Sequence, residues 1–173
     1  ILPLMASHGP PRVWYRHVEV LSGIPGVMFS YNLLGGPLFE EFGWRGFLQA
    51  RLQRALAPWI AAVCVGILWA TWHLPLFLVD GWNSGPLLAF FVTCIGLSTV
   101  FAFPFNASGQ SVAVAILMHS AFNASPRFLG AYLENCPMRE YLSGESFVAA
   151  AFLVPAVVLV TVTRGNLAAK RTA

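Results

Sequence analysis

The chain of 173 residues is 57% hydrophobic and only 10% charged, with a formal net charge of +3 at neutral pH. Soluble domains carry about 25% charged residues, so this composition excludes an ordinary soluble domain and predicts an integral membrane protein. The positive charge is small and scattered, which argues against nucleic acid as a partner and is more typical of topology signals between membrane spans.

Apolar stretches of about 20 residues, the length that crosses a bilayer as a helix, follow one another along the chain. None shows the period-two alternation of a half-buried strand, so helices are favoured. The predicted fold class is therefore all-α, a polytopic transmembrane helical bundle forming a single membrane domain over residues 1–173. About five spans are expected, at residues 24–52, 59–79, 86–105, 111–129 and 147–163.

The start of the chain, Ile1-Leu2-Pro3-Leu4-Met5, has no initiator methionine and no signal-peptide pattern. We therefore expect the chain to be a piece of a longer protein whose first spans precede it.

Between the third and fourth spans, residues 106–110 are predicted to form a short polar turn, and no role is assigned to them.

Two adjacent acids and an arginine interrupt the first span, in Phe39-Glu40-Glu41-Phe42-Gly43-Trp44-Arg45-Gly46. Ionisable residues at membrane depth are costly, so they are candidate functional residues. Pro37 is expected to restart the helix, placing both acids near its positive end. Glu41 and Arg45 are four residues apart and are expected to pair. Glu40 is turned about 100° away and is expected to face histidines of later spans.

The other embedded polar residues are His73 on the second span and His119 with Asn123 on the fourth. A carboxylate and an imidazole together can deprotonate a water molecule, a step worth about 10²–10⁴-fold in rate. A second imidazole and an amide can donate hydrogen bonds to a developing oxyanion. These residue types predict hydrolysis, and their need for one another as partners predicts that spans one, two and four are neighbours.

Other uses of the same residues stay open at this point. Glu40, His73 and His119 supply the ligand types of a zinc site with an open water position, assembled across spans. Alternatively, the acids and histidines relay protons in a transporter, or they hold helices together in a non-catalytic membrane scaffold. The absence of paired broken helices in two halves argues against the transporter.

The motifs resemble those of a protease family. Glu40-Glu41-x-x-x-Arg45, Trp69-x-x-x-His73 and His119-x-x-x-Asn123 occur in the order typical of the CPBP family. This family of CAAX prenyl proteases and bacteriocin-processing enzymes is also called the type II CAAX prenyl endopeptidase or Abi family. The resemblance covers about residues 37–123. It departs from the usual second motif at Trp69, where phenylalanine is expected; the residue remains aromatic.

The resemblance implies a membrane-embedded endopeptidase that hydrolyses a peptide or protein substrate at the lipid bilayer. It also implies a family core at about residues 24–164, more spans than five in the whole protein, and a location in a bacterial plasma membrane. The implied catalytic residues are the polar members of the three motifs: Glu40, Glu41, Arg45, His73, His119 and Asn123.

By analogy, Glu40 and His73 would activate the water, and His119 with Asn123 would stabilise the oxyanion. The remaining acid and the arginine would orient the site. If the enzyme is a metalloprotease, its Zn²⁺ would be held by Glu40, His73 and His119. A metal-free glutamate mechanism has also been argued for the family, so both mechanisms stay open, as do the prenylation of the substrate and the oligomeric state.

Overall fold

The computed structural model describes residues 36–79, 85–132 and 144–169, and every element in these ranges is helical. This agrees with the all-α fold class predicted from the sequence. In chain order the elements are α2 (Gly36–Glu41), the π-helix η2 (Phe42–Gln49), α3 (Ala50–Leu52), α4 (Pro58–Trp72), the 3-10 helix η3 (Leu74–Leu78), α5 (Leu87–Ala107), α6 (Val112–Tyr132) and α8 (Glu145–Val162).

Within the described ranges, three helical segments are long and apolar enough to cross a membrane: Pro58–Leu78, Leu87–Ala107 and Glu145–Val162. By length and composition they correspond to the predicted second, third and fifth spans. α6 itself covers Val112–Tyr132, and its described side chains form an apolar stretch over Val112–Ser125; the predicted fourth span stays a prediction. The first half of the predicted first span, residues 24–35, lies outside the described residues.

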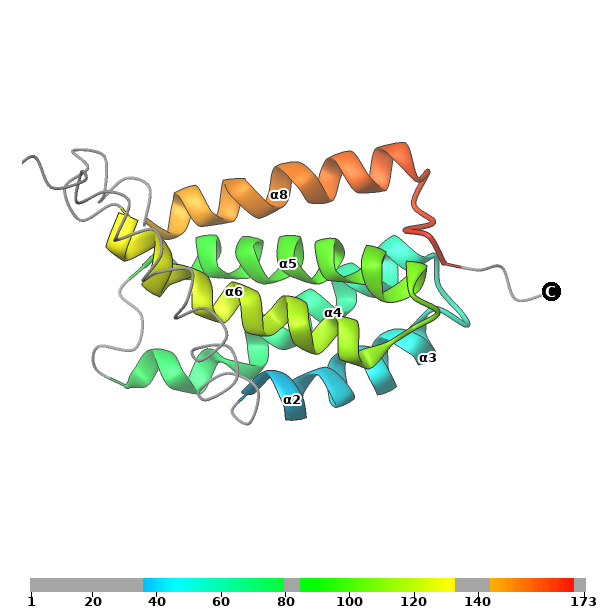
Figure 1. Ribbon diagram of the computed structural model, residues 1–173, viewed down its shortest axis with the longest axis horizontal. Helices are drawn as coiled ribbons and strands as arrows, with labels where there is room; N and C mark the ends of the chain where they lie inside the picture. The colour runs from blue at the N-terminus through cyan, green and yellow to red at the C-terminus, as the bar shows by residue number, and fades with distance from the viewer. Residues whose placement is uncertain (1–35, 80–84, 133–143, 170–173) are drawn as a thin grey trace, which may run out of the picture.

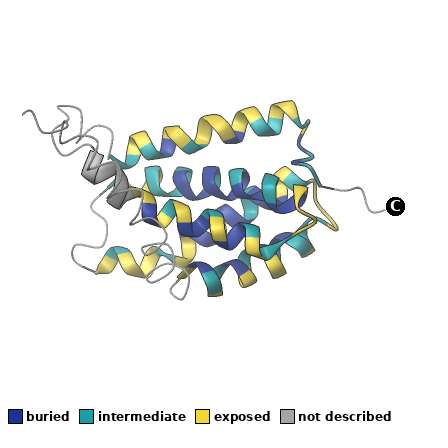
Figure 2. Ribbon diagram, viewed as in Figure 1, coloured by how far each residue is buried: buried dark blue, intermediate teal, exposed yellow. Residues whose placement is uncertain are grey.

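α5 lies at the centre of the bundle, between α8 and the remaining helices (Figure 1). It packs against α4 on one side and α8 on the other, and it also contacts α6. α8 is mostly exposed, whereas α5 carries a long series of buried residues (Figure 2). α2 contacts α6, and η2 contacts α4, α5 and α6. The helices that carry the three motifs are therefore neighbours, as their polar residues predicted.

Small residues let α4 and α5 approach closely. Ala62, Gly66 and Ala70 are spaced four apart on α4 and are buried. A Cβ atom built on Gly66 would lie 2.6 Å from the Cα atom of Ile95. Small residues at this spacing allow helix backbones to come together in a membrane, where packing rather than the hydrophobic effect drives association. A hydrogen bond from Ser98 Oγ to the Ala62 carbonyl, 2.8 Å long, adds to this contact.

The substitution Gly66→Ala is expected to lower the melting temperature of the protein in detergent. The added methyl group meets the α5 backbone, so the two helices have to separate; overpacking of this kind costs about 1–3 kcal/mol. Gly43→Ala is the matched control, because a Cβ atom at Gly43 meets nothing within 4 Å. Equal melting temperatures for the two variants would contradict the close α4–α5 contact.

Candidate functional site

The first motif begins at the end of α2 and continues into η2. Glu40 and Glu41 are the last two residues of α2, and Pro37 is its second residue. Trp44 and Arg45 lie in η2, which has the i→i+5 bonding of a π-helix. Segments of this kind are rare and often occur at functional sites. The amino-acid sequence carries no signal that distinguishes this π-helix from an ordinary α-helix.

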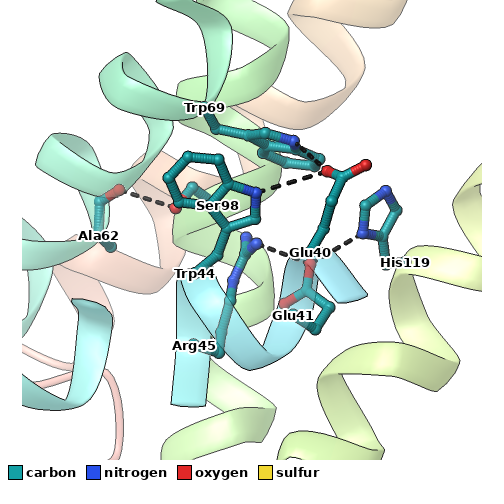
Figure 3. Close-up of polar contacts among 8 residues, drawn as sticks. All are labelled: Glu40, Glu41, Trp44, Arg45, Ala62, Trp69, Ser98 and His119. Carbon is teal, nitrogen blue, oxygen red and sulfur yellow. Dashed lines mark hydrogen bonds and ion pairs between the residues drawn. The ribbon is translucent and has the colours of Figure 1, made fainter. Parts of the chain in front are cut away.

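Glu41 is fully buried and binds two side chains. Arg45 Nη1 donates to Glu41 Oε1 at 2.8 Å, with both side chains 0% exposed. His119 Nδ1 lies 2.8 Å from the same oxygen (Figure 3). The predicted Glu41–Arg45 pair is thus confirmed, and His119 from α6 joins it. Because a carboxylate oxygen accepts, the Nδ1 atom of His119 carries the proton of this contact.

The guanidinium group of Arg45 lies over two neighbouring aromatic rings. Its central carbon is 5.0 Å from the centroid of Trp69 and 5.2 Å from that of Phe101. A desolvated contact of this type contributes about 2 kcal/mol, which offsets part of the lost hydration of the buried cation. Glu41 supplies the opposite charge. Removing either member of the pair would leave the other charge buried and uncompensated, which is strongly destabilising.

Glu40 is partly buried and engages a separate set of partners. Its Oε2 accepts a hydrogen bond from Trp69 Nε1 at 2.9 Å and a longer one from Trp44 Nε1 at 3.4 Å (Figure 3). The two adjacent acids therefore face different partners, as their angular offset predicted. One expected contact is corrected: His119 binds Glu41 rather than Glu40. The indole of Trp69 takes the place beside Glu40 that the histidines were expected to fill.

Trp69 brings Glu40 together with both histidines. Its ring centroid is 5.0 Å from that of His119 and 6.2 Å from that of His73, both in edge-to-face contacts. His73 Nδ1 lies 2.8 Å from the carbonyl oxygen of Trp69. That oxygen only accepts, so Nδ1 of His73 carries a proton as well. One indole thus joins polar residues from α2, from the end of α4 and from α6.

Asn123 lies one turn after His119 on α6 and is exposed, whereas His119 is buried. Within the described part of the chain, no hydrogen bond joins the Asn123 amide to Glu40, His73 or His119. The structure thus gathers five of the six predicted residues and leaves Asn123 at the edge of the group. Its role in oxyanion stabilisation stays a prediction.

The three residues expected to hold Zn²⁺ do not form a ligand cluster. Among the described residues, no group of three His, Cys, Asp or Glu side chains is arranged to hold a metal ion. Glu40 Oε2 is bound to an indole, and His119 Nδ1 is bound to Glu41. As placed, these side chains do not fit a zinc site. Zinc binding by Glu40, His73 and His119 stays a prediction.

Three amide side chains that sequence analysis did not single out support the motif helix. Gln49 donates to Gln53 at 3.0 Å, and Gln53 and Asn106 exchange hydrogen bonds of 2.9 Å. Asn106 also donates to the carbonyl of Leu167 at 3.0 Å. The predicted polar turn at residues 106–110 is therefore corrected at its start, because α5 continues to Ala107 and buries Asn106. The signal that was available is a polar residue at every fourth position from 41 to 53.

Comparison with known proteins points to one family. The sequence matches the family model described as type II CAAX prenyl endopeptidase, Rce1-like, over residues 23–125. It is 27% identical over 111 residues to "CAAX prenyl protease 2" of Methanococcus maripaludis, covering 60% of this chain and 41% of that protein. The chain thus spans about two fifths of the length of the curated relative that it matches. No solved structure matches it. The matched residues include all three motifs.

Proposed function

Because the chain belongs to the Rce1-like family of type II CAAX prenyl endopeptidases, we propose that it carries the catalytic centre of a membrane-embedded endopeptidase. In this proposal, Glu40 activates a water molecule that attacks the carbonyl carbon of a peptide bond. The observation that carries the proposal is the gathering of the Glu40 carboxylate and two imidazoles around the indole of Trp69.

Of the two adjacent acids, Glu40 is the better general base. Glu41 is 0% exposed and its Oε1 is shared by Arg45 and His119. Its Oε2 is also buried, without a hydrogen-bond partner in the described part of the chain, so neither oxygen faces solvent. Glu40 is partly exposed and can meet a water molecule. It takes one proton from that water as the oxygen bonds to the substrate carbon, and it returns the proton to the amine as the C–N bond breaks. General-base catalysis of this kind is worth about 10²–10⁴-fold.

The histidines are oriented for the other parts of the reaction. Glu41 holds the Nδ1–H of His119 and stabilises this ring when Nε2 is protonated, as a buried carboxylate does for a catalytic histidine. In that form Nε2–H donates to the oxyanion that develops on the substrate. His73, whose Nδ1–H is held by the Trp69 carbonyl, helps Glu40 to orient the water. The exposed Asn123 is the second proposed donor to the oxyanion.

The names of the family and of the relative point to prenylated substrates, and we extend that substrate class to this chain. Around His73, the side chains of Leu74, Leu76 and Leu78 are apolar and exposed. An apolar surface beside the site is suited to a substrate that approaches from the lipid with an isoprenoid group attached. The lipid bilayer is therefore part of the proposed environment of the reaction.

We expect the purified protein, reconstituted in liposomes, to cleave a quenched fluorescent peptide that ends in a farnesylated Cys-aliphatic-aliphatic-X sequence. The same peptide without the farnesyl group should be cleaved more slowly. His73→Ala should lower the rate by about 10²-fold or more, since it removes a group that orients the attacking water.

Equal cleavage of the two peptides would refute the prenylated substrate class and leave the endopeptidase activity standing. Failure to cleave either peptide, or full activity in His73→Ala, would contradict the proposed function.

A further inference from the structure

Trp69 adds a hydrogen-bond donor at a position where the resemblance leads one to expect phenylalanine. Its Nε1 donates to Glu40 Oε2 at 2.9 Å, and the side chain is only 3% exposed. Phenylalanine would fill the same space with a ring but would have no N–H group. The replacement of phenylalanine by tryptophan at position 69 therefore changes the hydrogen bonding of the motif as well as its aromatic ring.

The direction of this N–H group is fixed by the packing of the ring. Trp69 lies 6.5 Å from the centroid of Phe101 and 5.0 Å from that of His119. On its face lies the guanidinium group of Arg45, at 5.0 Å. A ring packed on several sides does not turn freely, so its donor stays aimed at Glu40. Rigid support of this kind keeps a functional side chain in the geometry that its reaction needs.

The two carboxylate oxygens of Glu40 have different neighbours. Oε2 accepts from Trp69 and, at 3.4 Å, from Trp44. Oε1 lies where a Cβ atom on Gly36 would be only 2.5 Å away. Glycine at position 36 thus leaves room for Oε1, while the two indoles hold Oε2. A free glutamate carboxylate turns easily about its last torsion, so this arrangement selects one orientation.

We propose that Trp69 is a positioning residue that holds Oε2 of Glu40, so that Oε1 is the oxygen that takes the proton from water. The catalytic consequence rests on the proposed function of Glu40 as the base. A base held in one orientation spends more of its time in reactive geometry. This affects the rate of the reaction, because misplacement by about 1 Å can cost about 10²-fold in rate. Trp44 assists through its longer bond to the same oxygen.

The activity test compares Trp69→Phe with Trp72→Phe in the farnesylated-peptide assay. Trp72 lies on the same helix and is 67% exposed, so it is the matched control for the loss of an indole. We expect Trp69→Phe to lower kcat by about 10–100-fold, the loss typical for one hydrogen bond to a charged group. KM should change by less than about twofold, since the substrate does not bind the lost N–H. Equal kcat for the two variants would overturn the proposal.

A second readout does not depend on activity. The protein has six tryptophans, whose indole N–H signals are resolved by NMR after ¹⁵N-tryptophan labelling. The signals of Trp69 and Trp72 are identified by their loss in the corresponding Phe variants. In Glu40→Gln the acceptor loses its charge, so the Trp69 indole proton should shift upfield while that of Trp72 stays in place.

The two readouts separate this inference from the proposed function. A Trp69 signal that does not respond to Glu40→Gln would overturn the hydrogen bond and with it the positioning role. If Glu40→Gln abolishes cleavage while Trp69→Phe has normal kcat, the role of Glu40 as the base is supported and the positioning role of Trp69 is contradicted. If the Trp69 signal responds but the protein cleaves no peptide, the hydrogen bond from Trp69 to Glu40 is supported and the proposed function is not.

Discussion

Glu40→Gln is expected to lower peptide cleavage by about 10²–10⁴-fold, because the amide cannot take a proton from water. The melting temperature should stay close to that of the wild type, since the amide oxygen can still accept from the Trp69 indole and the Glu41–Arg45 pair is untouched. Glu145→Gln is the matched control. Glu145 lies on α8 and accepts a hydrogen bond of 3.2 Å from Thr93, on a different helix from any motif residue.

Cleavage is to be measured at equal concentrations of folded protein for the wild type and both variants. Normal turnover in Glu40→Gln would remove this residue from the mechanism. A comparable loss in Glu145→Gln would mean that the effect reports a general loss of carboxylate charge rather than the chemistry of the site.

Arg45→Ala is expected to cost about 3–5 kcal/mol in the free energy of unfolding, because Glu41 then remains buried without a compensating charge. The substitution also removes the contacts of the guanidinium group with the Trp69 and Phe101 rings. Arg51→Ala is the control: Arg51 is exposed on α3 and lies 4.0 Å over the ring of Phe47. Contacts of an exposed arginine contribute about 1 kcal/mol or less.

The measurement for this prediction is unfolding in detergent, followed by the circular dichroism of the helices. A loss of stability in Arg45→Ala no larger than that in Arg51→Ala would contradict the predicted contribution of the buried Glu41–Arg45 pair to the free energy of unfolding.

Much of the fold follows from composition and from hydrophobic length. Residues 86–105 were predicted to form a span because they are apolar and carry no charged group. The corresponding helix, α5, covers Leu87–Ala107. The error of two residues at the end of this span has a physical cause. Asn106 is polar and was placed in a turn, but its amide is buried against Gln53 and the Leu167 carbonyl. A local pattern cannot show partners that lie 53 and 61 residues away.

The site was predictable where it depends on spacing within one helix. Glu41 and Arg45, four residues apart, form the pair that this spacing predicts. The partner of His119 was not predictable, because it depends on which of two adjacent acids faces α6. That choice follows from how α2 continues into the π-helix η2 and from the indole of Trp69 beside Glu40. Neither feature has a periodic signature in the sequence.

The division of labour between the two acids is tested most directly by comparing Glu40→Gln with Glu41→Gln, since both substitutions remove one charge and keep the shape of the side chain. For each variant, thermal unfolding in detergent and cleavage of the farnesylated peptide are measured on the same preparation. We expect Glu40→Gln to melt like the wild type and to be inactive. We expect Glu41→Gln to melt at a lower temperature, because Arg45 loses its buried counter-charge. A Glu41→Gln variant that melts like the wild type and is inactive, beside an active Glu40→Gln variant, would reverse the assignment.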